Sequence, residues 1–144
     1  MKVLLFLCVL FANSFIFSQE KVEWQALYNS TTKNIEIVAD IADGWHLYSQ
    51  YINPEIGPIP TQFKFKNNSL VSFKGNVVEP ESIKELDESF QEILPYFKDK
   101  AIFSQNVIFT NPTEVELIIS FMVCNNSVCL PPIEKMFKIK LQNN

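Results

Sequence analysis

Arginine is absent from this sequence of 144 residues, so all twelve of its basic residues are lysines. The formal net charge at pH 7 is −4. Recognition of nucleic acid needs a concentrated basic patch, and the composition therefore argues against a nucleic-acid partner. An anionic membrane surface is disfavoured for the same reason.

The sequence also lacks an apolar run long enough to span a hydrocarbon core of ~30 Å comfortably. The apolar run near the N-terminus follows the single charge of Lys2, and small or polar residues follow it up to Ser18. This layout is typical of a secretory signal peptide. We predict that residues 1–18 are cleaved off and that residues 19–144 form one exported domain without stable membrane insertion. A retained membrane anchor is the alternative.

Cysteine is scarce as well. The chain has three cysteines, and Cys8 lies within the predicted signal peptide. The exported domain would keep only Cys124 and Cys129, in a compartment where disulfides form. These two and the single histidine, His46, fall short of the four ligands, or three and a water molecule, that a zinc site needs. We therefore predict no metal site and no cofactor.

Short segments in which apolar and polar residues alternate are abundant, and each predicts a half-buried strand. Residues 80–92 show no such pattern, and we interpret them as a charged, partly mobile excursion with room for one helical turn. Strands at this regular spacing, separated by turn signals, predict an all-β, immunoglobulin-like β-sandwich without a second domain. The predicted strands cover residues 22–28, 35–41, 45–49, 61–66, 70–73, 76–79, 94–97, 101–109, 114–123 and 133–141.

The two remaining cysteines lie at the tip of the hairpin predicted from the last two strands. Four residues separate Cys124 from Cys129, and Pro131 and Pro132 follow. A disulfide across so short a loop contributes only about 2 kcal/mol by the chain-entropy argument. A domain of this length should fold without that contribution. The pair is therefore either a structural staple or a redox-active disulfide, although its spacing is not the C-x-x-C of thioredoxin-like proteins.

Three segments resemble one known family, the N-terminal periplasmic domain of the thiol:disulfide interchange protein DsbD. Residues 124–132 (CNNSVCLPP) are similar to its signature of two cysteines, an aromatic or aliphatic residue and two prolines. Residues 43–49 (DGWHLYS) resemble its D-G-[aromatic]-[YH]-L-Y segment. Residues 87–90 (DESF) and 96–101 (YFKDKA) resemble its acidic-aromatic cap loop and the Y-x-D segment that follows.

The resemblance implies an immunoglobulin-like fold in which Cys124 and Cys129 form a redox-active pair. Such a domain works in the periplasm as a component of thiol:disulfide interchange. It takes electrons from a DsbD-type membrane protein through a thioredoxin-like domain and passes them to periplasmic oxidoreductases. The alternative is a non-enzymatic immunoglobulin-like binding module of the envelope, with a structural disulfide. The reduction potential separates the two, because structural disulfides typically lie below about −300 mV.

The same resemblance assigns the residues around the pair. Asp87, Glu88 and Phe90 would belong to a shielding cap, and His46 and Tyr48, which share one face of their strand, would line the site. From the residues alone, the acidic pair is more simply a solvated loop face, and the aromatic pair is equally well the edge of the core. Carboxylates near a thiol disfavour its thiolate. We therefore expect thiols with an ordinary or raised pKa until a partner displaces the cap.

Overall fold

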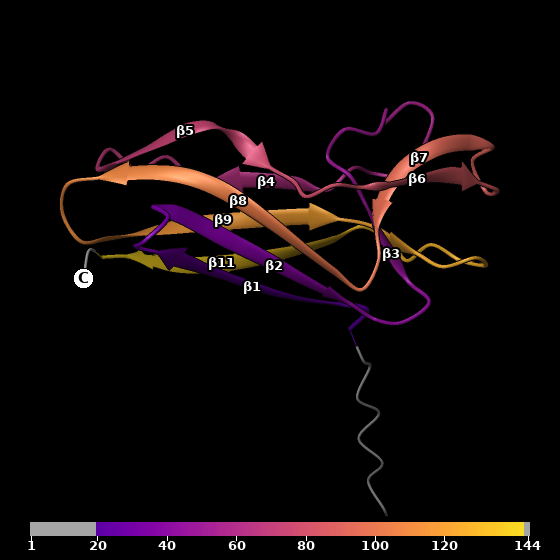
Figure 1. Cartoon of the computed structure of the whole chain (residues 1–144), viewed down its shortest axis with the longest axis horizontal. Helices are drawn as coiled ribbons and strands as arrows, with labels where there is room; N and C mark the ends of the chain where they lie inside the picture. The colour runs from indigo at the N-terminus through magenta and orange to yellow at the C-terminus, as the bar shows by residue number, and fades with distance from the viewer. Residues whose placement is uncertain (1–19, 143–144) are drawn as a thin grey trace, which may run out of the picture.

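The computed structural model describes residues 20–142, so the predicted signal peptide lies outside the described residues. The described chain is all-β, as predicted, and Figure 1 shows strands joined by turns and loops. Within this range no helix is present that is long and apolar enough to cross a membrane. The strands are β1 (Val22–Asn29), β2 (Asn34–Ile41), β3 (His46–Tyr48), β4 (Gln62–Phe65), β5 (Val71–Val78), β6 (Ile83–Asp87), β7 (Glu92–Phe97), β8 (Lys100–Phe109), β9 (Thr113–Phe121), β10 (Val123–Cys124) and β11 (Ile133–Leu141).

Two antiparallel sheets form an immunoglobulin-like sandwich along the long axis of the molecule (Figure 1). One sheet has the order β1-β2-β8-β5, and the other has the order β11-β9-β4. Alternate side chains of each strand point to the same face, so the inward faces supply a continuous apolar core. Aromatic rings join the two sheets. Trp24 of β1 packs against Phe121 of β9, and Phe63 of β4 packs 4.8 Å from Phe103 of β8.

A third sheet, with the order β10-β3-β7-β6, stands at one end of the sandwich, on the right of Figure 1. In its centre β3 pairs with β10 on one side and with β7 on the other. A second, smaller apolar cluster lies beside this sheet. Its buried members are Tyr48, Ile52, Leu94, Tyr96 and Cys124.

The predicted C-terminal hairpin is confirmed, because β9 and β11 pair from Phe121 opposite Ile133 to Thr113 opposite Leu141. The predicted strand 114–123 is divided, however. β9 ends at Phe121, and the chain then leaves the sandwich to form β10 in the third sheet. The apolar run is buried in both sheets, so its residues give no sign of the change.

The two short strands predicted around Gly75 are one strand, β5. Its register against β8 shifts between Lys74 and Val78, and Gly75 has a φ of +67°. Glycine adopts this left-handed conformation without steric cost, so the strand continues through an irregularity that looks like a break in the sequence.

The prediction for residues 80–92 was wrong, because this stretch contains β6 and the start of β7, which pair as a hairpin. The expected pattern is missing because polar residues of β6 contact tyrosines while apolar residues of the hairpin are exposed. Glu85 and Asp87 of β6 accept hydrogen bonds from buried tyrosines. Leu86 and Ile93, opposite each other in the register, are 61 % and 66 % exposed. Each side of β6 mixes apolar and polar residues, because Ile83 shares a side with Glu85 and Lys84 shares a side with Leu86, so the strand does not show the usual amphipathic signal.

Candidate functional site

A disulfide joins Cys124 and Cys129 at the end of the molecule that carries the third sheet. Cys124 lies in β10, and Cys129 forms an isolated antiparallel bridge with it. The two sulfur-bearing residues differ in exposure, because Cys124 is 1 % exposed whereas Cys129 is only partly buried. A reagent or partner from solution therefore meets Cys129 first.

Backbone hydrogen bonds shape the short loop between the cysteines. Asn125 N donates to Val128 O and Leu130 N donates to Val123 O, each at 2.9 Å, so one bond lies on either side of the disulfide. The Asn125 side-chain oxygen accepts from the backbone N–H groups of Ser127 and Val128, each at 2.8 Å. This Asx-type turn explains why asparagine follows the first cysteine.

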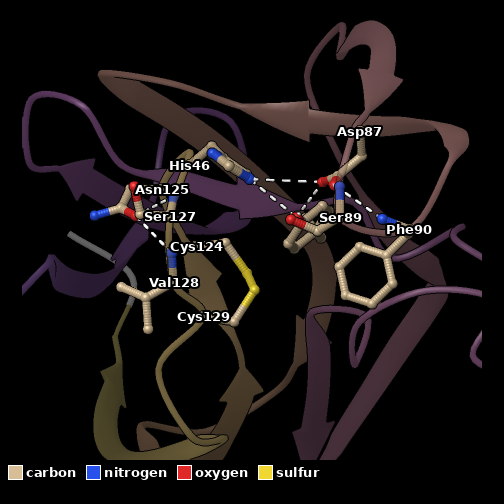
Figure 2. Close-up of a disulfide and its surroundings, with 10 residues drawn as sticks. His46, Asp87, Ser89, Phe90, Cys124, Asn125, Ser127, Val128 and Cys129 are labelled. Carbon is tan, nitrogen blue, oxygen red and sulfur yellow. Dashed lines mark hydrogen bonds and ion pairs between the residues drawn. A yellow bond between two sulfur atoms is a disulfide. The ribbon is translucent and has the colours of Figure 1, made fainter.

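A chain of polar contacts joins β3 to β6 above the disulfide (Figure 2). Tyr48 donates its hydroxyl to Oδ2 of Asp87 at 2.6 Å, and His46 Nε2 lies 2.9 Å from the same hydroxyl. Because the tyrosine proton is used toward Asp87, the tyrosine oxygen accepts from His46, which assigns the Nε2–H tautomer to the neutral imidazole. His46 Nε2 also lies 4.0 Å from Asp87 Oδ2.

Asp87 holds the tip of the hairpin as well. Its Oδ1 accepts from the backbone N–H groups of Ser89 at 2.9 Å and Phe90 at 3.3 Å. Gln91 N donates to Asp87 O at 2.7 Å, and Gln91 has a φ of +56°. One carboxylate thus fixes the turn through one oxygen and fastens it to β3 through the other. We call β6, β7 and residues 88–91 between them the cap hairpin.

Phe90 and Glu88, both at the tip of the cap hairpin, are placed differently. Phe90 packs against the second apolar cluster, as Cys129 does, and its ring is 6.5 Å from the Tyr48 ring, edge to face. In Figure 2, Phe90 and the loop that carries Val128 flank the disulfide. Glu88 is exposed, and its backbone oxygen accepts from Gln91 Nε2. The structure therefore gathers His46, Tyr48, Asp87 and Phe90, while the Glu88 carboxylate stands outside their hydrogen bonds.

A pocket of about 320 Å³ opens between the cap hairpin and the cysteine loop. Polar atoms make up most of its lining. It is lined by His46, Glu85, Leu86, Asp87, Glu88, Ser89, Tyr96, Lys98, Asn125 and Asn126.

The surroundings shift the pKa values of the two aromatic site residues. Burial raises the pKa of Tyr48, and its hydrogen bond to Asp87 and the negative charge of that residue raise it further. Burial lowers the pKa of His46 below its ordinary value of 6.5, against the attraction of Asp87 and with a smaller contribution from Lys98. Near neutral pH His46 is therefore an uncharged imidazole and Tyr48 an uncharged donor.

Sequence reasoning gave no role to three further residues of the site. Tyr96 of β7 donates its hydroxyl to Glu85 Oε2, and its ring lies 5.0 Å from that of His46. Lys98 Nζ lies 5.1 Å above the Tyr96 ring and 4.0 Å from Glu85. These contacts depend on the pairing of β6 with β7, which the sequence pattern did not show. Among residues 20–142 no group of three or more His, Cys, Asp or Glu side chains is arranged to hold a metal ion.

The fold and this site define a class: an immunoglobulin-like domain with a single disulfide beneath a cap hairpin. The chain belongs to the family described as thiol:disulfide interchange protein DsbD, N-terminal, which matches residues 12–141. No curated protein sequence matches the chain.

Solved structures share the fold at low sequence identity. The DsbD N-terminal domain of Neisseria meningitidis in its reduced form aligns with a TM-score of 0.63 and 17 % identity, over 86 % of this chain and 87 % of that one. The structure described as the complex of the DsbD and PilB N-terminal domains of the same organism aligns with a TM-score of 0.63 and 16 % identity, over 88 % of each chain. The N-terminal periplasmic domain of ScsB from Proteus mirabilis aligns at 0.51 and 18 %, over 83 % of this chain and 44 % of that one.

Proposed function

We propose that this domain exchanges thiols and disulfides with thioredoxin-like oxidoreductases through Cys124 and Cys129. The observation that carries the proposal is that Cys124 is buried and Cys129 is only partly buried, beside the cover that Phe90 of the cap hairpin forms. A disulfide that only fastens a hairpin needs no such cover. Membership of the DsbD N-terminal family supports the same conclusion.

The unequal exposure assigns a role to each cysteine. When a partner reduces the domain, the partner's thiolate attacks Cys129 Sγ, the bond to Cys124 breaks, and Cys124 leaves as a thiolate. The partner's second thiol then attacks the mixed disulfide. The partner ends as a disulfide and the domain as two thiols, with two electrons and two protons transferred. Oxidation of the domain runs through the same steps in reverse.

On this proposal, the cap hairpin regulates access to the disulfide. Asp87 holds Phe90 over the pair through its contacts with Tyr48 and with the tip, and Glu88 adds charge to the exposed rim. Docking of a partner displaces the tip of the cap hairpin, whereas small oxidants and reductants encounter the disulfide with the cap hairpin in place. The cap thereby favours exchange with proteins over exchange with small thiols.

The proposed setting is the periplasm, reached after removal of residues 1–18. The Neisseria domain of similar fold has been solved with a PilB domain, and the similar ScsB domain is described as periplasmic. By this analogy, electrons reach the domain from a DsbD-type membrane protein through a thioredoxin-like domain and leave it toward periplasmic oxidoreductases.

Trapping of a mixed disulfide tests the exchange. The Cys124→Ala variant is mixed with a thioredoxin-like protein whose one remaining active-site cysteine carries a thionitrobenzoate leaving group. Attack by Cys129 should release thionitrobenzoate and form a covalent complex that dithiothreitol dissolves. The Cys129→Ala variant is the matched control and should form far less, because Cys124 is buried. The reduction potential of the wild-type Cys124–Cys129 disulfide, measured against a glutathione buffer, should lie above about −300 mV. A lower reduction potential together with no covalent complex would instead support the alternative, a binding module whose disulfide is only structural.

A further inference from the structure

His46 and Cys124 are direct neighbours across two strands. They are register partners in the β3–β10 pair, and His46 is the only histidine of the chain. Directly opposed residues of antiparallel strands have Cβ atoms about 4.5–5.5 Å apart on the same face of the sheet. Backbone pairing therefore places the His46 side chain next to that of the buried Cys124.

Exchange at this site requires the buried Cys124 thiol to lose and regain a proton. Its side chain is buried in the cluster of Tyr48, Ile52, Leu94 and Tyr96, and burial disfavours a thiolate. The Cys124 thiol must nevertheless lose its proton when the disulfide closes, and the Cys124 thiolate must gain one when the disulfide opens. A group inside the site that can hold a proton in passing would remove this obstacle.

The carboxylates and tyrosines that face His46 are already committed. Tyr48 on β3 donates to Asp87 on β6, and Asp87 also accepts two backbone N–H groups. Tyr96 on β7 donates to Glu85 on β6. Neither tyrosine is available as a base near neutral pH, because their surroundings raise both pKa values.

The other polar groups around His46 do not serve either. Lys98, which follows β7, lies over the Tyr96 ring and carries a positive charge, and Glu88 is exposed. Asn125 and Asn126 are neutral amides. His46 uses Nε2 toward Tyr48, which leaves Nδ1 outside this chain of hydrogen bonds. An uncharged imidazole with a free lone pair is the one group here suited to accept a proton.

We propose that His46 is a further catalytic residue, whose Nδ1 accepts the proton of the Cys124 thiol as the disulfide closes. This inference rests on the exchange proposed above. The Cys124 thiolate attacks Cys129 in the mixed disulfide, the Cys129–partner bond breaks, and the partner leaves as a thiolate that is protonated from solution. The imidazolium then loses its proton to solvent through the pocket that it lines. In the opening direction His46 takes up a proton from solvent through the same pocket and passes it to the Cys124 thiolate.

Dithiobis(nitrobenzoate) separates the two chemical steps in a single experiment on the reduced protein. Attack by Cys129 releases the first thionitrobenzoate, and attack by Cys124 on the mixed disulfide releases the second. His46→Gln keeps a side-chain N–H for Tyr48 but holds no proton on a ring nitrogen. We expect an unchanged first phase, and a second phase slowed about 100-fold, the lower limit of general acid–base catalysis.

The pH profile of the second phase distinguishes a base from a structural contact. The wild type should show an acidic limb, that is, a fall in the rate of the second phase at low pH as His46 becomes protonated. His46→Gln should lack this limb. Tyr48→Phe is the matched control, because it removes the hydrogen bond to His46 but keeps the imidazole, and it should retain the limb. Equal second phases with the same limb in the wild type and His46→Gln would overturn the proposal. Release of both groups by a protein that forms no complex with thioredoxin-like proteins would overturn only the proposed function.

The wild type provides a second measurement that needs no variant. Because the chain has one histidine, its ring ¹⁵N resonances need no assignment among histidines. Near neutral pH they should report the Nε2–H tautomer in the reduced protein. The Nδ1–H tautomer would leave no lone pair for the Cys124 proton and would overturn the proposal.

Discussion

The hydroxyl of Tyr48 lies 2.6 Å from Oδ2 of Asp87, a residue 39 positions further along the chain. This hydrogen bond directly links β3, the strand paired with the cysteine-bearing β10, to the tip of the cap hairpin. The same carboxylate also accepts hydrogen bonds from the turn, so it both fixes the conformation of the tip and attaches the tip to β3.

Removal of this link should loosen the cover. Tyr48→Phe loses a hydrogen bond to a charged group, which contributes about 1.5–3 kcal/mol. We expect the disulfide to be reduced by dithiothreitol at least severalfold faster than in the wild type, as measured by quenched alkylation. Tyr28→Phe, at a tyrosine that packs on Phe109 in the sandwich, is the control and should leave the rate unchanged. Equal rates in Tyr48→Phe and the wild type would show that the link does not hold the cap closed.

Phe90 is expected to shield the pair by its bulk. Phe90→Ala removes the ring that packs beside Cys129, so the reduced protein should react faster with a small oxidant such as diamide. Ile93→Ala changes an exposed side chain on the outward side of the same hairpin and serves as the comparison. If both variants react at the wild-type rate, Phe90 is ordinary packing.

The thiols of the reduced protein should be poor nucleophiles in the isolated domain. Burial of Cys124 and the nearby Asp87 carboxylate both disfavour a thiolate, so we expect pKa values at or above the ordinary value of about 8.5. The rate of alkylation by iodoacetamide as a function of pH measures them. A strongly depressed pKa would contradict the electrostatics of this site.

Stability should fall on mild acidification because of His46. Its pKa is lowered in the folded protein, so the unfolded chain binds more protons as the pH falls below 6.5. The free energy of unfolding therefore decreases with falling pH in this window, and this part of the decrease should be missing in His46→Gln. Urea unfolding of both proteins at about pH 7.5 and about pH 5.5 measures the difference. A wild type that loses no more stability than the variant would contradict the lowered pKa of His46 in the folded protein.

A second carboxylate fixes the segment that follows β3. Glu79 accepts from the buried Ser49 hydroxyl at 2.6 Å and from Gln50 N at 3.0 Å. Glu79→Gln weakens both contacts and should lower the free energy of unfolding by about 1–3 kcal/mol, as an unsatisfied buried group does. Glu81→Gln, at an exposed neighbour, should have no measurable effect in the same urea titration. An equally stable Glu79→Gln protein would mean that water replaces these contacts.

The sandwich could be predicted from the sequence where apolar residues face the core on alternate positions. Ile35, Ile37 and Ala39 of β2 are buried as their spacing predicts. The same rule fails for the cap hairpin, where Asp87 is partly buried as the acceptor of the Tyr48 hydroxyl while the apolar Leu86 is exposed. The hairpin was therefore predicted as an irregular excursion.

The arrangement around the cysteines depends on pairings between distant segments. The family resemblance pointed to His46 and Tyr48 at the site, yet the register that puts His46 opposite Cys124 joins residues far apart in the chain. Local periodicity carries no information on such a register. Tyr96 and Glu85 were missed for the same reason, since their contact exists only once β6 and β7 pair.

The backbone bonds from Asn125 to Val128 and from Leu130 to Val123 do not involve sulfur. They frame the cysteines as a non-hydrogen-bonded pair of a hairpin, an arrangement that does not require the covalent bond between them. Reduction thus severs one bond in a loop that is otherwise tied at both ends. In the proposed exchange the oxidised and reduced proteins would therefore have nearly the same contour, and an electron donor and an electron acceptor would bind the same surface.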